Sequence, residues 1–152
     1  MKDRLKSNLK RLERLVDIRE TYVSAAETSV KQAENEVRRL HEVERNLAGN
    51  IRRVQAEIAH LRVAIGRDVH KEENYIQALE SQRKLVLQSL ETTMGNLEKR
   101  RKEWTEAMRE KKTVARLQER RLHQWKREDD VAQQKSQDDA FIARYVRTRL
   151  EN

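Results

Sequence analysis

Apolar residues recur along the first part of the chain at alternating steps of four and three residues. Starting at Leu5, this spacing leads to eighteen positions ending at Ile65, of which only Arg19 and Glu44 are polar. A period of 3.5 residues kept over this length predicts an α-helix with one narrow apolar stripe, the seam of a coiled coil. The positions of this first seam are Leu5, Leu9, Leu12, Val16, Arg19, Val23, Ala26, Val30, Ala33, Val37, Leu40, Glu44, Leu47, Ile51, Val54, Ile58, Leu61 and Ile65.

A second stretch carries a weaker stripe, in which eleven of fifteen positions are apolar. Its phase slips by one residue between Val86 and Met94, just before Gly95, which predicts a local irregularity of the helix there. The positions of this second seam are Ile76, Leu79, Arg83, Val86, Leu90, Met94, Leu97, Arg101, Trp104, Met108, Lys111, Ala115, Gln118, Leu122 and Trp125.

The segment between the two stripes has the features of a turn. Gly66 follows the last position of the first seam, where a left-handed C-terminal cap suits glycine, and Asp68 can cap the next helix. A short connection between two long helices indicates an antiparallel hairpin. We therefore predict an all-α protein, a long antiparallel two-helix coiled-coil hairpin formed by residues 1–152 as a single unit. Its helices are expected over about 3–65 and 69–148, with the turn near residues 65–71.

The two predicted helices differ in length. Folded back at the turn, the first helix reaches roughly residue 135 of the second, at one rise per residue on each side. The C-terminal part of the second helix is therefore expected to overhang. It carries an apolar patch that has no partner in the hairpin: Phe141, Ile142, Tyr145 and Val146.

Composition excludes several functional classes. The chain has no cysteine and no proline, and 39% of its residues are Asp, Glu, Lys or Arg. It therefore has no disulfide framework or thiol nucleophile, and it contains no catalytic triad, phosphate loop or metalloprotease motif. Its four histidines are scattered, which argues against a metal site. We expect no enzymatic activity, cofactor or metal. The sequence also lacks an apolar run long enough for a membrane span or a signal peptide, so we expect a cytoplasmic protein.

Charge leaves two interpretations open. The chain carries 34 Lys or Arg and 26 Asp or Glu, and the basic tract, which we define as residues 99–127, includes the run KRRK at its start. This tract is either a solvated helix face or a collar that docks a partner of complementary charge. Trp104 and Trp125 fall on the seam rather than between the basic residues, which disfavours a nucleic-acid platform. Arg19 and Glu44 either fix the helix register or extend to solvent.

Several motifs together resemble the FliJ family of flagellar type III export, which has YscO-type counterparts in injectisomes. These motifs are LKRLERLVDIRE at the start, YIQALE after the turn, W-x-x-x-M-REKK, and RRLHQWKREDD-x-x-x-QK near the end. The resemblance implies a hairpin similar to the γ subunit of rotary ATP synthases. It implies a central stalk that inserts its terminal end into the pore of a hexameric export ATPase. It also implies that the stalk links this ring to the export gate and handles export chaperones at the cytoplasmic base of the apparatus.

The resemblance assigns residues to two contacts. Near the turn, Tyr75 and Leu79 are expected to bind the cytoplasmic domain of the export gate. The residues expected to bind the ATPase ring are Arg120, Arg121, Trp125, Lys126, Arg127, Phe141, Arg144, Tyr145 and Arg147. We expect a monomer that neither binds nucleic acid nor inserts into a membrane. Two other classes remain open at this point, namely a self-associating structural coiled coil, which the Gly-Asn dipeptides at 49 and 95 would divide, and a basic nucleic-acid binder.

Overall fold

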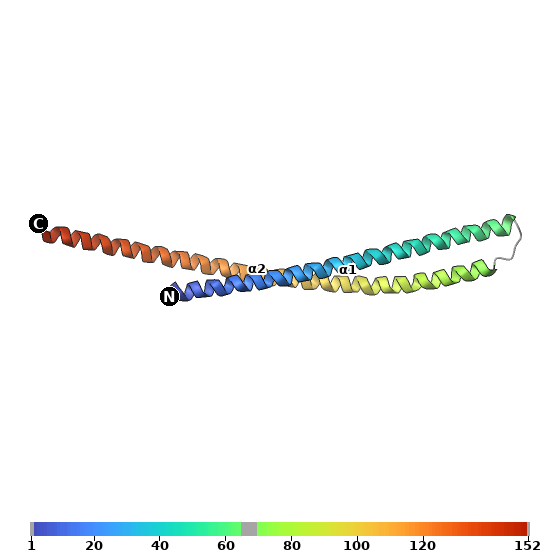
Figure 1. The fold of residues 1–152 in the computed structure, drawn as a ribbon, viewed down its shortest axis with the longest axis horizontal. Helices are drawn as coiled ribbons and strands as arrows, with labels where there is room; N and C mark the ends of the chain where they lie inside the picture. The colour runs from blue at the N-terminus through green and yellow to red at the C-terminus, as the bar shows by residue number, and fades with distance from the viewer. Residues whose placement is uncertain (1, 65–69, 152) are drawn as a thin grey trace. The chain divides into compact units, whose positions relative to one another are not determined.

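The computed structural model describes residues 2–64 and 70–151, and both stretches are helical. Helix α1 spans Lys2–Ala64 and helix α2 spans His70–Glu151 (Figure 1). The two helices pack against each other as a helical hairpin, which confirms the predicted fold class, and their bounds lie within a few residues of the predicted ones. The predicted cap at Gly66 and Asp68 falls outside the described residues.

The first seam forms the α1 side of the helix interface. Every one of its described positions, Leu5 through Leu61, is buried or half-buried. Its buried residues are Leu5, Leu12, Val23, Ala33, Leu40, Ile51, Val54 and Ile58. On α2 the buried residues are only Leu79, Leu90 and Leu97. The interface is therefore thin, and one helix supplies most of it.

The second seam departs from its predicted phase. The half-buried positions of α2 include Thr93, Arg100 and Arg121, where we had predicted Met94, Arg101 and Leu122. With these residues the three-and-four spacing continues through Gly95 without a slip, so the predicted irregularity is wrong. The Thr93 hydroxyl donates to the Ser89 carbonyl at 2.7 Å, which satisfies a polar group that would otherwise be costly to place on a seam.

The chain divides into two compact units, which we describe separately: residues 25–105, and residues 1–24 with 106–152. In the unit of residues 25–105, α1 and α2 run antiparallel, because Glu44 pairs with Arg83 at 2.9 Å and Glu34 pairs with Arg101 at 3.5 Å. Arg62, near the end of α1, forms an ion pair with Glu73, near the start of α2. Val54 and Ile58 form a small core with Leu61 and Ile76 packed against it.

The other unit pairs the first turns of α1 with the middle of α2. Arg19 pairs with Glu110 at 2.6 Å and Glu20 pairs with Lys111 at 4.0 Å, so both ion pairs join the two helices within this unit. On α2, half-buried positions continue as far as Asp129, and every described residue from 130 to 151 is exposed. The predicted overhang is therefore present, and it begins a few residues earlier than expected.

Candidate functional site

The overhang, which we define as residues 130–151 of α2, presents large apolar side chains to solvent. Phe141 is 69% exposed and Tyr145 is 56% exposed, while Ile142 and Val146 are similarly open. Exposed apolar residues gathered on one helix segment mark an interaction surface more often than a neutral surface. No described residue of the unit covers them.

Arginines border this apolar surface. The guanidinium of Arg149 lies 5.9 Å from the centre of the Tyr145 ring, a cation–π contact within one helix. Arg144 and Arg147 are exposed and have no ion-pair partner within the described part of the chain. Arginine and aromatic side chains dominate the energetics of protein interfaces, so this composition suits docking of a protein partner.

The ring-assigned residues of the basic tract are arranged differently. Arg120, Lys126 and Arg127 are exposed, whereas Arg121 and Trp125 are half-buried. Arg121 donates to the side-chain oxygen of Gln124 at 3.2 Å, so its guanidinium is engaged on its own helix. Of the five residues of the basic tract that were assigned to the ring contact, three are therefore exposed cations and two lie at the helix interface.

Trp125 has a polar group without a partner. Its indole Nε1 atom is buried and makes no hydrogen bond within the described residues. An unpaired buried donor costs about 1–3 kcal/mol, so the site bears a local penalty where α1 begins. Trp125 and Phe141 lie sixteen positions apart on one helix, on the order of 24 Å along its axis. They do not form one contiguous site.

Near the start of α2, the two gate-assigned residues have unequal exposure. Tyr75 is 51% exposed, whereas Leu79 is 6% exposed and belongs to the helix interface. Only the tyrosine is available for a direct contact in this conformation, and Leu79 supports the helix that carries it.

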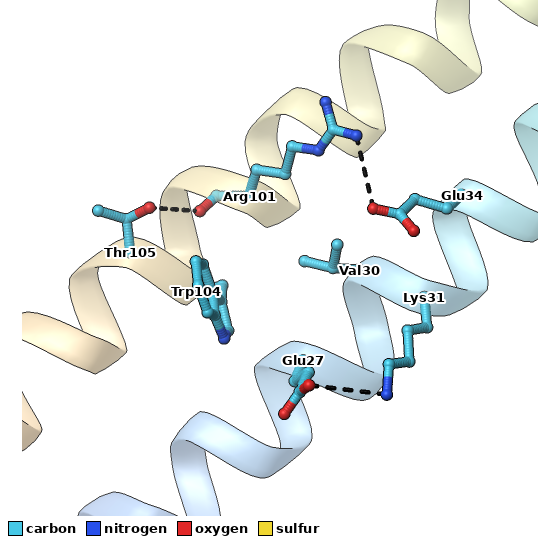
Figure 2. Close-up of a pocket in the computed structure, with 7 residues that line it drawn as sticks. All are labelled: Glu27, Val30, Lys31, Glu34, Arg101, Trp104 and Thr105. Atoms are coloured by element: carbon cyan, nitrogen blue, oxygen red, sulfur yellow. Dashed lines mark hydrogen bonds and ion pairs between the residues drawn. The ribbon is translucent and has the colours of Figure 1, made fainter.

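A groove beside Trp104 is a feature that sequence reasoning missed. Trp104, predicted to lie in the core, is 37% exposed and borders a groove of about 410 Å³ with Val30 (Figure 2). Two ion pairs flank it, Lys31–Glu27 at 3.6 Å and Arg101–Glu34 at 3.5 Å. The sequence does contain a feature that could have predicted this groove. A tryptophan that faces small seam residues of α1 leaves space beside its ring.

The described residues contain no group of three or more His, Cys, Asp or Glu side chains placed to hold a metal ion. None of their helices combines the length and the apolar character that crossing a membrane requires.

Comparison with known proteins identifies a family. The family model described as "Flagellar FliJ protein" matches residues 8–150, nearly the full chain. No curated protein matches the chain, and no solved structure matches it.

Proposed function

We propose that this chain, which belongs to the flagellar FliJ family and is a flagellar export-associated protein, is the central stalk of the export apparatus. In this role it has no catalytic activity of its own. It inserts into the hexameric export ATPase and couples that ring to the export gate and to substrate chaperones. It acts in the cytoplasm, peripherally, at the base of the apparatus.

The observation that carries the proposal is the uncovered end of α2. A helix that continues past its partner, with Phe141 and Tyr145 open to solvent and arginines around them, is suited to enter a protein pore. Burial of two aromatic anchors contributes several kcal/mol, at roughly 1.5–3 kcal/mol each, to such a contact. The exposed cations Arg120, Lys126 and Arg127 add electrostatic attraction to an acidic rim.

At the other end of the stalk, we assign the gate contact to Tyr75, with Leu79 holding the helix beneath it. An exposed tyrosine offers apolar area and a hydroxyl at a low entropy cost. Substitution Tyr75→Ala is expected to weaken gate binding and leave the helical content unchanged.

The direct test mixes the purified chain with its cognate ATPase. Hydrolysis rate and oligomer size are measured as the chain is titrated, and both are expected to rise. A lack of change in both at saturating chain contradicts the proposal.

A truncation tests which segment makes the contact. Deletion of residues 138–152 removes only exposed side chains among those described, so the melting temperature is expected to stay nearly unchanged. ATPase stimulation is expected to be lost. Unfolding of the truncated chain contradicts the register, and normal stimulation moves the ring contact to the basic tract.

A matched pair of full-length variants separates a specific contact from a general loss of apolar surface. Phe141→Ser is expected to reduce stimulation at least tenfold, the equivalent of about 1.4 kcal/mol of lost binding. Leu85→Ser alters a comparably exposed residue, at 63%, in the other unit and is expected to leave stimulation unchanged.

A further inference from the structure

The overhang carries a pattern that complements itself. Asp138, Ile142, Tyr145 and Arg149 are spaced four, three and four residues apart and so lie along one face of α2. Along this face an acid comes first, then two apolar residues, then a base. When two such faces are placed antiparallel, the acid of one therefore lies opposite the base of the other. We propose that the overhang pairs antiparallel with the overhang of a second copy of this chain, about a two-fold axis midway along this line.

The surface that this pairing needs is available in the structure. Ile142 is 57% exposed and Tyr145 is 56% exposed, and Phe141 and Val146 widen the same apolar area. Asp138 is exposed as well, so its carboxylate is accessible to a partner. Covering four apolar residues from each copy removes this area from water, which is the main driving force of association.

The two-fold axis decides which residues meet. It places Ile142 against Tyr145 of the second copy, and Asp138 against Arg149 of the second copy. By symmetry each contact occurs twice, as in any isologous interface. Every position along the line therefore meets a residue of complementary chemistry.

Charge selects this orientation over the parallel one. A parallel pair in register would place Asp138 against Asp138 and Arg149 against Arg149, and like charges facing each other across a helix pair are destabilising. The same polarity extends beyond the line, because Asp139 precedes the apolar residues while Arg144 and Arg147 lie among and after them. Only the antiparallel arrangement brings the acidic part of one copy to the basic part of the other.

The short length of the paired segment makes the association reversible. It lies at the low end of specific interfaces, below about 1,200 Å² of buried surface, where complexes are weak and transient. The pair therefore forms at high protein concentration and dissociates on dilution. Where the overhang also contacts the ATPase, which rests on the proposed function, the pair is a resting form that covers the contact surface.

Sedimentation equilibrium of the full chain, without any ATPase, measures the pairing. Over a range of roughly 1–500 µM, the mass is expected to rise from that of one chain toward that of two. Added salt is expected to shift this rise to higher concentration, because exposed ion pairs are screened. A monomer at every concentration overturns the proposal.

A charge-swap cycle tests the predicted contact. Asp138→Arg and Arg149→Asp each place like charges together and are expected to raise the dissociation constant at least tenfold. The double variant restores opposite charges and is expected to recover pairing. Lys84→Glu, a reversal at an exposed residue of the other unit, is the matched control and is expected to have no effect. Failure of the double variant to recover pairing overturns the assignment.

Spin labels test the orientation, because the chain has no cysteine and a label attaches only where one is introduced. In the proposed pair, labels at Ala143→Cys lie within about 20 Å of each other, since they flank the axis. Labels at Val131→Cys lie on the order of 37 Å apart along the helix axis. A short distance at both positions indicates parallel pairing and overturns the proposal.

A lipid surface is the alternative occupant that the measurements distinguish. The wild-type chain is mixed with vesicles of anionic phospholipid and sedimented. Retention on vesicles by a chain that stays monomeric in solution would assign the amphipathic segment to membrane binding and overturn self-pairing. Because no ATPase is present in these experiments, their failure leaves the proposed function standing, and the reverse also holds.

Discussion

Three polar residues on the helix interface, Arg19, Glu44 and Arg100, have partners on the facing helix. Arg19 and Glu44, whose role the sequence left open between register and solvent exposure, pair across the interface with Glu110 and Arg83. The Arg100 guanidinium donates to the Ser29 backbone carbonyl at 3.0 Å. Each contact is compatible with one alignment of the two helices, so these residues favour register rather than simple solvation.

A charge reversal at this interface is expected to be reversible by a second one. The Glu44 side chain is only 17% exposed, so Arg83→Glu places two carboxylates together in a partly desolvated position. We expect a loss of about 1–2 kcal/mol in the free energy of unfolding. Adding Glu44→Arg is expected to recover most of it in urea denaturation. A double variant no more stable than the single one would show that the pair does not set the register.

Because the indole Nε1 of Trp125 is buried without a partner, we expect two substitutions of this residue to have opposite effects on stability. Trp125→Phe removes the buried donor and keeps most of the apolar area, so the free energy of unfolding is expected to stay equal or rise by up to about 1 kcal/mol. Trp125→Ala also removes the packing and is expected to lower it by about 1–2 kcal/mol, less than for a fully buried residue. Urea unfolding of both variants provides the measurement. A phenylalanine variant as unstable as the alanine one would contradict this account.

At the scale of whole elements, α1 could be predicted almost completely and α2 only in outline. Apolar side chains occupy every described position of the first seam on α1 except Arg19 and Glu44, so the pattern alone identifies the buried face of this helix. On α2 the pattern selected Met94 and Leu122 because they are apolar, but both are at least 40% exposed. Thr93 and Arg121 lie at the interface instead, because local hydrogen bonds satisfy their polar groups. The periodicity of apolar residues contains no information about such hydrogen bonds.

Gly49 and Gly95, which both lie inside helices, offer a test of helix stability. A Cβ atom added at Gly49 or at Gly95 would meet nothing within 4 Å. Replacement by alanine therefore introduces no clash, and it is expected to stabilise the helix by about 0.5–1 kcal/mol at each position. Thermal unfolding checks this, with the reverse change at exposed Ala78→Gly as the control, which is expected to destabilise. An alanine variant that melts lower than the parent would indicate a bend that requires glycine.

Protection of backbone amides against hydrogen exchange is expected to be highest where the two helices pair and lowest where α2 is uncovered. Residues 51–61 of α1 include Val54 and Ile58, which form the small core. The overhang, in contrast, is a single helix with every described residue exposed. Most helical stability in proteins comes from packing of an apolar face, which the overhang lacks in the described structure, so the overhang is expected to exchange its amide protons fastest among the helical residues. Hydrogen–deuterium exchange at low protein concentration makes the comparison. Equal protection in both segments would require a partner for the overhang.

The overhang could be predicted from the sequence, because the first seam is shorter than the helical pattern that faces it. The partner proposed for the overhang could not be predicted from the heptad seam, because the seam reports only which residues pack between the two helices of the hairpin. The exposed apolar residues Leu15, Ile18 and Tyr22 on α1 were missed for a similar reason. They lie off the seam, where the heptad pattern makes no statement about them.

The antiparallel pairing also fixes an order of events during synthesis. Arg62 and Glu73 are separated by 11 positions, whereas Arg19 and Glu110 are separated by 91. At about 5–20 residues per second, a ribosome needs roughly 5–18 s to add the second partner of the longer pair. The part of α1 that is made first therefore stays uncovered longest, with Leu5 and Leu12 open to other nascent chains.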